Sequence, residues 1–172
     1  MGDNQKRQYC YTMEELTKFA IEALKRRNIG LDDLAKIVHS LQVDYHPDLD
    51  LETCRESIRS VMRKREVVHA ILTGIALDEL AEQNLLKEPL LSIVKSDEGL
   101  FGIDEIIPLS IVNIYGSIGL TNYGYLDKKK YGIIKELDEA KDDSVNTFLD
   151  DIVAALAAAA SSRIAHSYVE YK

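Results

Sequence analysis

The feature that most constrains the fold is an alanine-rich stretch near the C-terminus, residues 147–166. Alanine has the highest helix propensity, and the larger apolar side chains of this stretch recur at helical spacing, so the stretch predicts a long helix. From residue 152 to residue 160, apolar atoms cover most of the circumference of this helix. A helix that is apolar on all sides is normally buried on all sides. We therefore expect the rest of the chain to pack around it.

Two adjacent carboxylates, Asp150 and Asp151, lead directly into this buried helix. An unpaired carboxylate is costly to bury, so each is expected to have a cation, a set of hydrogen-bond donors or water beside it. The nature of these partners is the main functional question that the sequence raises.

Composition indicates a soluble globular protein with a single domain over residues 1–172. This length is enough for a sizeable core, and 46% hydrophobic with 29% charged residues is ordinary for such a domain. The N-terminus has no basic-then-apolar leader. The longest apolar run, residues 152–160, is shorter than the about 20 residues that span a bilayer. We therefore expect a cytoplasmic protein with no transmembrane segment.

Charge argues against nucleic acid as a general partner, because 29 acidic residues outnumber 21 basic ones. Arg55, Arg59 and Arg63 are spaced four apart and would share one face of a helix. The favoured interpretation of this basic face is a solvated surface paired with nearby glutamates. The two cysteines form no disulfide framework and no CxxC pair.

Helical signals begin after a loose lead-in over residues 1–11. Thr12 and Glu15 have the spacing of a capping box, and Gly30 is suited to a left-handed cap at the end of this first helix. A second helix is expected over residues 32–41. Residues 51–86 predict one long helix or two nearly continuous ones, with a kink near residues 63–65.

The second half of the chain also has helical patterns and no convincing strand. A helix is expected from about residue 104 to residue 114, with Pro108 in its first turn, where no amide donor is needed. Residues 116–132, rich in Gly and Tyr, are expected to form a structured loop, and residues 133–140 a short helix. The sequence thus predicts an all-α, single-domain bundle of about six to eight helices around the buried C-terminal one.

Three acidic clusters interrupt otherwise apolar sequence: Asp104 with Glu105, Asp127 alone, and Asp150 with Asp151. Carboxylates that converge from several elements form a hard-oxygen site, which suits Mg²⁺ or Mn²⁺ rather than Zn²⁺. Each cluster also has a structural explanation: charges at a helix N-terminus, a turn residue, or a buried ion pair of Asp150 with one of residues 128–130 or with Arg163. From spacing alone, the functional and structural interpretations are about equal.

The same clusters, quoted with their neighbours, resemble the phosphatidylglycerophosphatase A family, in particular its soluble Gram-positive branch of small helical proteins. They are Asp104-Glu105, Leu126-Asp127-Lys128-Lys129-Lys130, and Leu149-Asp150-Asp151-Ile152-Val153-Ala154-Ala155. The resemblance covers roughly residues 70–165, and the last run is its most specific part. The sequence departs from the family pattern at Tyr131, where a proline usually follows the lysine, and at Ala155, where membrane-bound members have glycine. The transmembrane helices of those members are also missing.

The resemblance implies a Mg²⁺- or Mn²⁺-dependent enzyme that removes the terminal phosphate of phosphatidylglycerophosphate to give phosphatidylglycerol. Its substrate would be a phosphorylated molecule, such as a lipid at a membrane surface. The metal-holding and catalytic candidates are Asp104, Glu105, Asp127, Asp150 and Asp151. Lys128 and Lys130 would neutralise the substrate phosphate. The alternative is a non-catalytic helical binding or regulatory protein that keeps the acidic cluster as a structural network. Whether the protein is a homo-oligomer is open at this stage.

Overall fold

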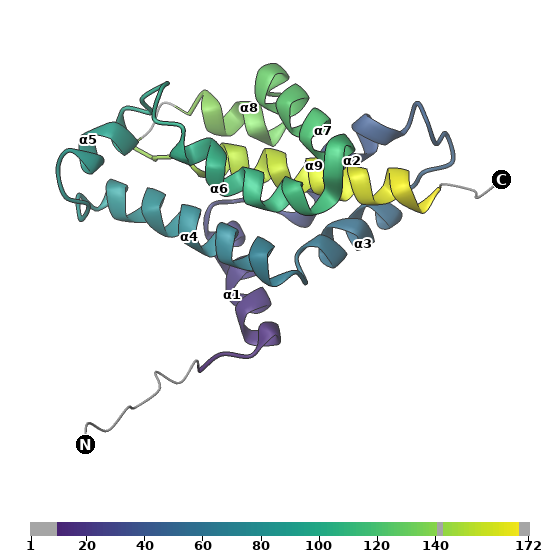
Figure 1. Ribbon diagram of the computed structural model, residues 1–172, viewed down its shortest axis with the longest axis horizontal. Helices are drawn as coiled ribbons and strands as arrows, with labels where there is room; N and C mark the ends of the chain where they lie inside the picture. The colour runs from purple at the N-terminus through teal and green to yellow at the C-terminus, as the bar shows by residue number, and fades with distance from the viewer. Residues whose placement is uncertain (1–9, 141–142, 169–172) are drawn as a thin grey trace.

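The structure is a computed structural model that describes residues 10–140 and 143–168. Every regular element in these two ranges is a helix, which confirms the predicted all-α fold (Figure 1). The predicted lead-in over residues 1–11 lies mostly outside the described residues. The elements are α1 (Met13–Arg26), α2 (Leu31–Gln42), α3 (Leu51–Val61), α4 (Arg65–Glu82), α5 (Leu90–Lys95), α6 (Ile103–Val112), the 3₁₀ helix η1 (Asn113–Tyr115), α7 (Gly116–Lys129), α8 (Ile133–Asp138) and α9 (Leu149–Ser167).

Helix α9 runs through the middle of the bundle, as its alanine-rich sequence predicts (Figure 1). Every side chain from Leu149 to Ser162 is buried, and so is Ile164. Helices α2, α3, α4, α6, α7 and α8 all pack against it. The separation of two packed helices depends on the side chains between them, so the small alanine side chains let several helices approach one axis.

The start of α1 agrees with the sequence, whereas its end does not. Glu15 N donates to Thr12 Oγ1 at 3.2 Å and Thr12 N donates to Glu15 Oε2 at 2.7 Å, which is the predicted capping box. The left-handed residue after α1 is Asn28, with φ of +60°, and not Gly30. Asparagine tolerates this conformation because its short side chain can hydrogen-bond locally. Gly30 instead has φ of −96° and is the N-cap residue of α2.

The predicted break in residues 51–86 lies between α3 and α4, where residues 62–64 leave the helical conformation. Two arginines of the basic face on α3 are paired with acidic neighbours, as expected. Arg55 binds Asp32 at 2.7 Å and Glu52 at 3.0 Å. Arg59 binds Glu52 at 2.8 Å and Glu56 at 2.7 Å.

Two predictions for the middle of the chain are wrong. Residues 116–132 form a helix, α7, over most of the length where a structured loop was expected. Its buried residues, Gly119, Tyr123 and Leu126, recur at helical spacing and pack on α9, so tertiary packing outweighs the low helix propensity of glycine. Pro108 lies inside α6 rather than in its first turn, because the helix begins at Ile103. Proline has no N–H, so the intrahelical hydrogen bond at this position is lost.

The stretch Ile103–Lys129 is long and apolar enough, by length and composition alone, to cross a membrane. Its most apolar window has a mean hydropathy of 1.3, and 22% of that window is buried in the fold. The stretch is divided by η1 and by Gly116, whose φ of +70° turns the chain between α6 and α7. The absence of a transmembrane segment therefore stays a prediction.

Two helical glycines test how closely α4 approaches α9. A Cβ atom added to Gly74 on α4 would collide with the Ile152 side chain and lie 3.1 Å from Phe148 Cβ, whereas one added to Gly124 on α7 would meet nothing within 4 Å. We expect Gly74→Ala to lower the free energy of unfolding by about 1–2 kcal/mol through overpacking. Gly124→Ala should raise it by up to about 1 kcal/mol through helix propensity. Urea unfolding curves measure both, and equal stabilisation by the two variants would contradict the close contact of α4 with α9.

Candidate functional site

Asp150 and Asp151 lie in the first turn of α9, at the point where the chain enters the core. Their side chains are buried, with exposed fractions of 7% and 6%. A helix N-terminus has free backbone N–H groups and the positive end of the helix dipole, both of which stabilise carboxylates. Asp151 N donates to Asp150 Oδ1 at 2.9 Å. The local helix geometry therefore explains in part how two adjacent acids are tolerated here.

A third carboxylate, Asp78 on α4, caps the beginning of α9 from a neighbouring helix. It is completely buried and accepts from Phe148 N at 3.2 Å and from Leu149 N at 3.0 Å. Because phenylalanine has no polar side-chain atom, the residue at the N-cap of α9 cannot supply these acceptors itself. The sequence analysis missed Asp78. Its signal is the helical spacing of Ile71, Ile75 and Asp78, which places an acid on the apolar face of α4.

A network around Arg27 fixes the chain that leads into α9. Arg27 binds Glu82 at 2.6 Å and donates to the carbonyl of Val145 at 2.7 Å and to Asn146 Oδ1 at 2.9 Å. Thr147 Oγ1 donates to the carbonyl of Val94 at 2.6 Å. Residues 145–147 are thus held by Arg27, the C-cap residue of α1, and by α4 and α5, two residues before the acidic pair.

Lys130, at the end of α7, is the cation beside Asp150. Its Nζ lies 3.0 Å from Asp150 Oδ2 and 2.6 Å from Asp138 Oδ1. The structural explanation offered for Asp150, an ion pair with one of residues 128–130, is therefore realised. The hydrogen bonds and charges of Asp138 and Asp150 raise the pKa of Lys130 against the opposing effect of burial. Lys128 is exposed on α7 and pairs with no acid in the two described ranges.

Charges from all three predicted acidic clusters act on Asp151. Burial and the charges of Asp150, Asp127 and Asp104 raise the pKa of Asp151 to about 8, although Lys130 lowers it. Burial likewise raises the pKa of Asp150 to about 6, with Lys130 again opposing the shift. Each neighbouring negative charge disfavours ionisation of the buried carboxylates. The electrostatic coupling shows that elements far apart in sequence bring their carboxylates into one neighbourhood.

Tyr123 on α7 borders the same acidic neighbourhood and was not singled out from the sequence. Burial and the charges of Asp151, Asp127 and Glu105 raise the pKa of its hydroxyl. Glu105 is exposed on α6 and lies close enough to Tyr123 for its charge to act on the hydroxyl. Asp104 Oδ1 is buried without a hydrogen-bond partner within residues 10–140 and 143–168, whereas the Tyr123 hydroxyl lies close enough to Asp151 for a hydrogen bond to contribute to its pKa shift. Such orphaned buried atoms are uncommon and call for a partner outside the chain, such as water or an ion.

The donor chemistry of this neighbourhood fits a hard divalent cation. It is all oxygen, carries several negative charges and holds an orphaned carboxylate oxygen at Asp104. Among the residues that the structure describes, no three His, Cys, Asp or Glu side chains are already arranged to hold a metal ion. Asp104, Asp127 and Asp151 would have to turn toward one another to ligate one ion, so metal binding stays a prediction.

A polar cavity of 160 Å³ lies beside Asp150, between the end of α5, α8 and the entry to α9. Lys95, Asp97 and Asp138 contribute charged side chains to its lining. Partial desolvation and the charges of Asp104 and Asp138 raise the pKa of Asp97, which Lys130 lowers, so the cavity adjoins the acidic cluster. Asp97 and Asp138 were not predicted, because one reads as a turn residue and the other as an ordinary helix position.

Removing the Lys130 charge should destabilise the fold, because the buried Asp150 carboxylate then lacks its cation. We expect Lys130→Met to lower the free energy of unfolding by about 2–3 kcal/mol at pH 8, where Asp150 would be charged and unpaired. The loss should shrink at pH 5, where Asp150 can be protonated. Lys129→Met is the matched control, because Lys129 is exposed. Chemical denaturation at the two pH values measures both variants, and equal losses for Lys130→Met and Lys129→Met would contradict the ion pair.

Comparison with known proteins places this geometry in a family. A family model described as phosphatidylglycerophosphatase A matches residues 26–166. The chain is 61% identical to the uncharacterized protein YpjQ of Bacillus subtilis over 158 residues, which are 92% of this chain and 89% of that protein. It is 54% identical to the uncharacterized protein YutG of the same organism over 143 residues, or 83% of this chain and 86% of YutG.

Solved structures show the same fold. The crystal structure of YpjQ superposes with a TM-score of 0.88, covering 92% of this chain and 98% of that one. The crystal structure of the low temperature requirement C protein from Listeria monocytogenes, 54% identical, superposes with a TM-score of 0.88 and covers 91% of this chain and 99% of that one. Taken with the matched region, these similarities show that the chain belongs to the phosphatidylglycerophosphatase A family.

Proposed function

We propose that this protein is a divalent-metal-dependent phosphomonoesterase and that its substrate is a phosphorylated glycerolipid of the phosphatidylglycerophosphate type. The observation that carries the proposal is the cluster around Asp151, where burial together with the charges of Asp150, Asp127 and Asp104 raises the carboxylate's pKa to about 8. Strongly perturbed carboxylates that cluster in this way are typical of functional sites. Family membership supports a phosphatase as the reaction class.

In the proposed mechanism, Asp104, Asp127 and Asp151 would hold Mg²⁺ or Mn²⁺, which when bound neutralises phosphate charge and lowers the pKa of water. Lys130 would donate from Nζ to a phosphate oxygen, while Asp150 and Asp138 hold its ammonium group in place. A carboxylate of the cluster that faces the attacking water would accept its proton. By capping the start of α9, Asp78 would fix the positions of Asp150 and Asp151 relative to the acidic residues on α6 and α7.

An apolar surface beside the acidic cluster supports a lipid substrate. Ile103 and Ile106 flank Asp104 and Glu105 on α6, with exposed fractions of 48% and 59%, and Leu100, just before the helix, is 92% exposed. Exposed apolar groups gathered at one place commonly mark a site for an apolar ligand or a membrane. A substrate with a phosphate head and acyl chains could then contact both the cluster and α6.

A specific observation also favours the second candidate function, a non-catalytic helical binding or regulatory protein. Lys130 and Asp150 form an ion pair, and Asp78 accepts hydrogen bonds from the start of α9, so part of the acidic network is structural. The test is release of inorganic phosphate from phosphatidylglycerophosphate and from glycerol 3-phosphate, with Mg²⁺ or Mn²⁺ and with a chelator. Metal-dependent release supports the enzyme, whereas no release from either substrate supports the binding protein.

The contribution of the apolar surface can be measured separately from the chemistry. We expect Ile106→Asp to lower kcat/KM for phosphatidylglycerophosphate in vesicles by about tenfold, which corresponds to about 1.4 kcal/mol. Hydrolysis of soluble glycerol 3-phosphate should change less than about twofold, since Ile106 is exposed and lies outside the cluster. Phe19→Asp, at an exposed apolar position on α1, is the matched control. Equal losses on both substrates would show that Ile106 does not act through the lipid chains.

A further inference from the structure

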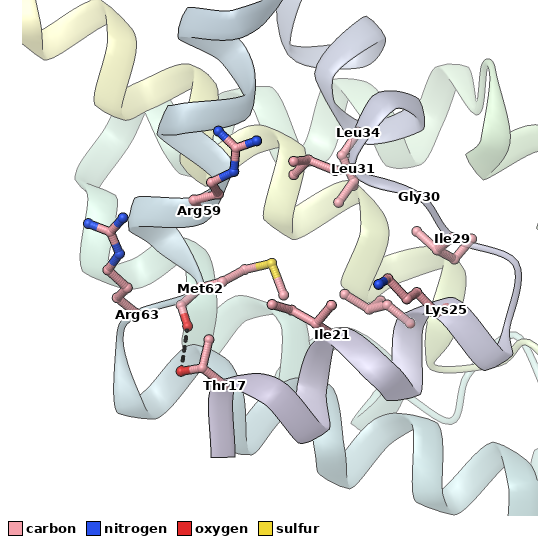
Figure 2. Close-up of a pocket in the computed structure, with 11 residues that line it drawn as sticks. Thr17, Ile21, Lys25, Ile29, Gly30, Leu31, Leu34, Arg59, Met62 and Arg63 are labelled. Atoms are coloured by element: carbon pink, nitrogen blue, oxygen red, sulfur yellow. Dashed lines mark hydrogen bonds between the residues drawn. The ribbon is translucent and has the colours of Figure 1, made fainter. Parts of the chain in front are cut away.

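A second cavity, of 430 Å³, lies between α1, α2 and α3 and shares no lining residue with the polar cavity beside Asp150. It exists because α1 packs chiefly on α4, whereas α2 and α3 pack on each other and on α9. At one end of the cavity, Thr17 Oγ1 on α1 donates to the carbonyl of Met62 at 3.5 Å (Figure 2). This long hydrogen bond connects α1 to the residue that follows α3. The volume is within the range of small-molecule sites.

The interior of this cavity is apolar. Its lining includes four side chains that belong to the hydrophobic core, Leu24, Ile29, Leu34 and Met62. Ile21 also lines it and is 38% exposed, so an apolar wall reaches from the core to the surface. A chain of methylene groups could replace water along this wall with a gain in free energy.

The charged residues that line the cavity, Lys25, Arg59 and Arg63, are all basic, in a protein with a net charge of −8. Arg59 is neutralised by Glu52 and Glu56. Lys25 and Arg63 form no ion pair with any residue in the described part of the chain. Figure 2 shows Lys25 on the α1 side of the cavity, near Ile29, and Arg59 and Arg63 on the opposite side, in and just beyond α3. An apolar interior with an unpaired cation on each of two sides is complementary to an anionic head on an apolar tail.

We propose that this cavity is a binding site for a single-chain anionic amphiphile, with its chain among Leu24, Leu34 and Met62 and its carboxylate or phosphate head at Lys25. This site is distinct from the acidic cluster and does not depend on the proposed phosphatase activity. A carboxylate and a phosphate head share the chemistry that an unpaired cation recognises, so a comparison of a carboxylate probe with a phosphate probe decides which head group binds.

The full-length protein can be titrated with decanoate, decyl phosphate and uncharged decanol by isothermal titration calorimetry, below their micelle concentrations. We expect saturable binding of at least one of the two anions and at least about tenfold weaker binding of decanol. Saturation by decanoate alone would identify a carboxylate site, and tighter binding of decyl phosphate a phosphate site. No saturable binding of either anion, or equal binding of decanol, would overturn the proposal.

Variants test the location of the site. The charge reversal Lys25→Glu should weaken binding of the preferred anion at least about tenfold, and Ile21→Trp should do so by filling the cavity. The matched controls are Lys18→Glu and Phe19→Trp, which change exposed α1 residues outside the lining and should alter binding less than about twofold. Circular dichroism melting confirms folding of each variant. Unchanged binding in folded Ile21→Trp, or a dimer in sedimentation velocity that this substitution dissociates, would contradict an amphiphile site.

Discussion

The Asp151→Asn variant is expected to lose phosphate release from phosphatidylglycerophosphate by about 10²–10³-fold and, at the same time, to unfold at a higher temperature than the natural protein above pH 7. Activity falls because the variant loses a carboxylate at the centre of the cluster. Stability rises because Asp151 is buried among Asp150, Asp127 and Asp104, and its ionisation is unfavourable there. A purely structural residue would not give this opposite pair of effects.

The sign of the pH dependence follows from the raised pKa. Asp151 has a pKa of about 8 in the folded state and an ordinary value near 3.8 when unfolded, so between these values the folded state binds more protons. Stability in the absence of metal should therefore fall as pH rises from about 4 to about 8. Asp78, with a pKa raised to about 8 chiefly by burial, adds to the same slope. Calorimetric melting across this range should show a shallower slope for Asp151→Asn.

Asp48→Asn is the matched control for this experiment, because Asp48 is exposed in the loop between α2 and α3. It should leave both activity and the pH profile unchanged. Wild-type activity in Asp151→Asn, together with a wild-type pH slope, would contradict the central place of Asp151 in the cluster.

Asp78→Ala is expected to give the largest loss of stability, about 2–4 kcal/mol in the free energy of unfolding. The substitution leaves the backbone N–H groups of Phe148 and Leu149 without their acceptor at the buried start of α9, and each orphaned donor costs about 1–3 kcal/mol. Asp78→Asn should lose less, since its amide oxygen can still accept a hydrogen bond. The measurement is guanidinium unfolding followed by circular dichroism.

Glu66→Ala, at an exposed position in the first turn of the same helix α4, is the matched control and should change stability by no more than about 0.5 kcal/mol. If Asp78→Ala were as stable as this control, the helix-capping role of Asp78 would be wrong. Partial activity in Asp78→Asn would agree with a positioning role rather than contact with substrate.

The parts of the fold that the sequence predicted are those set by local signals. The alanine-rich composition of α9, the Thr12 and Glu15 capping box and the break between α3 and α4 each depend on residues close in sequence. Helix α7 was missed because its glycines disfavour a helix locally. Its stability comes from the packing of Tyr123 and Leu126 in the core beside α9, which is distant in sequence. The left-handed position was misplaced for a similar reason, since both Asn28 and Gly30 suit it.

The acidic clusters could be identified from sequence because acids rarely interrupt apolar helices without a reason. That charges from these clusters act on Asp151 follows from how α6, α7 and α9 pack, which no local pattern encodes. The roles of Lys130 and Asp78 likewise depend on contacts between distant elements. Of the two lysines proposed for the substrate phosphate, Lys130 lies beside Asp150 and Lys128 is exposed on the surface.

The most direct test of the central claim is Mg²⁺-dependent release of inorganic phosphate from phosphatidylglycerophosphate, measured in parallel for the natural protein and for Asp151→Asn. The acidic cluster around Asp151 predicts release that requires Mg²⁺ or Mn²⁺, stops with a chelator and falls by about 10²–10³-fold in the variant. No metal-dependent release by the folded natural protein, or equal release by the two, would contradict a phosphatase site at the start of α9.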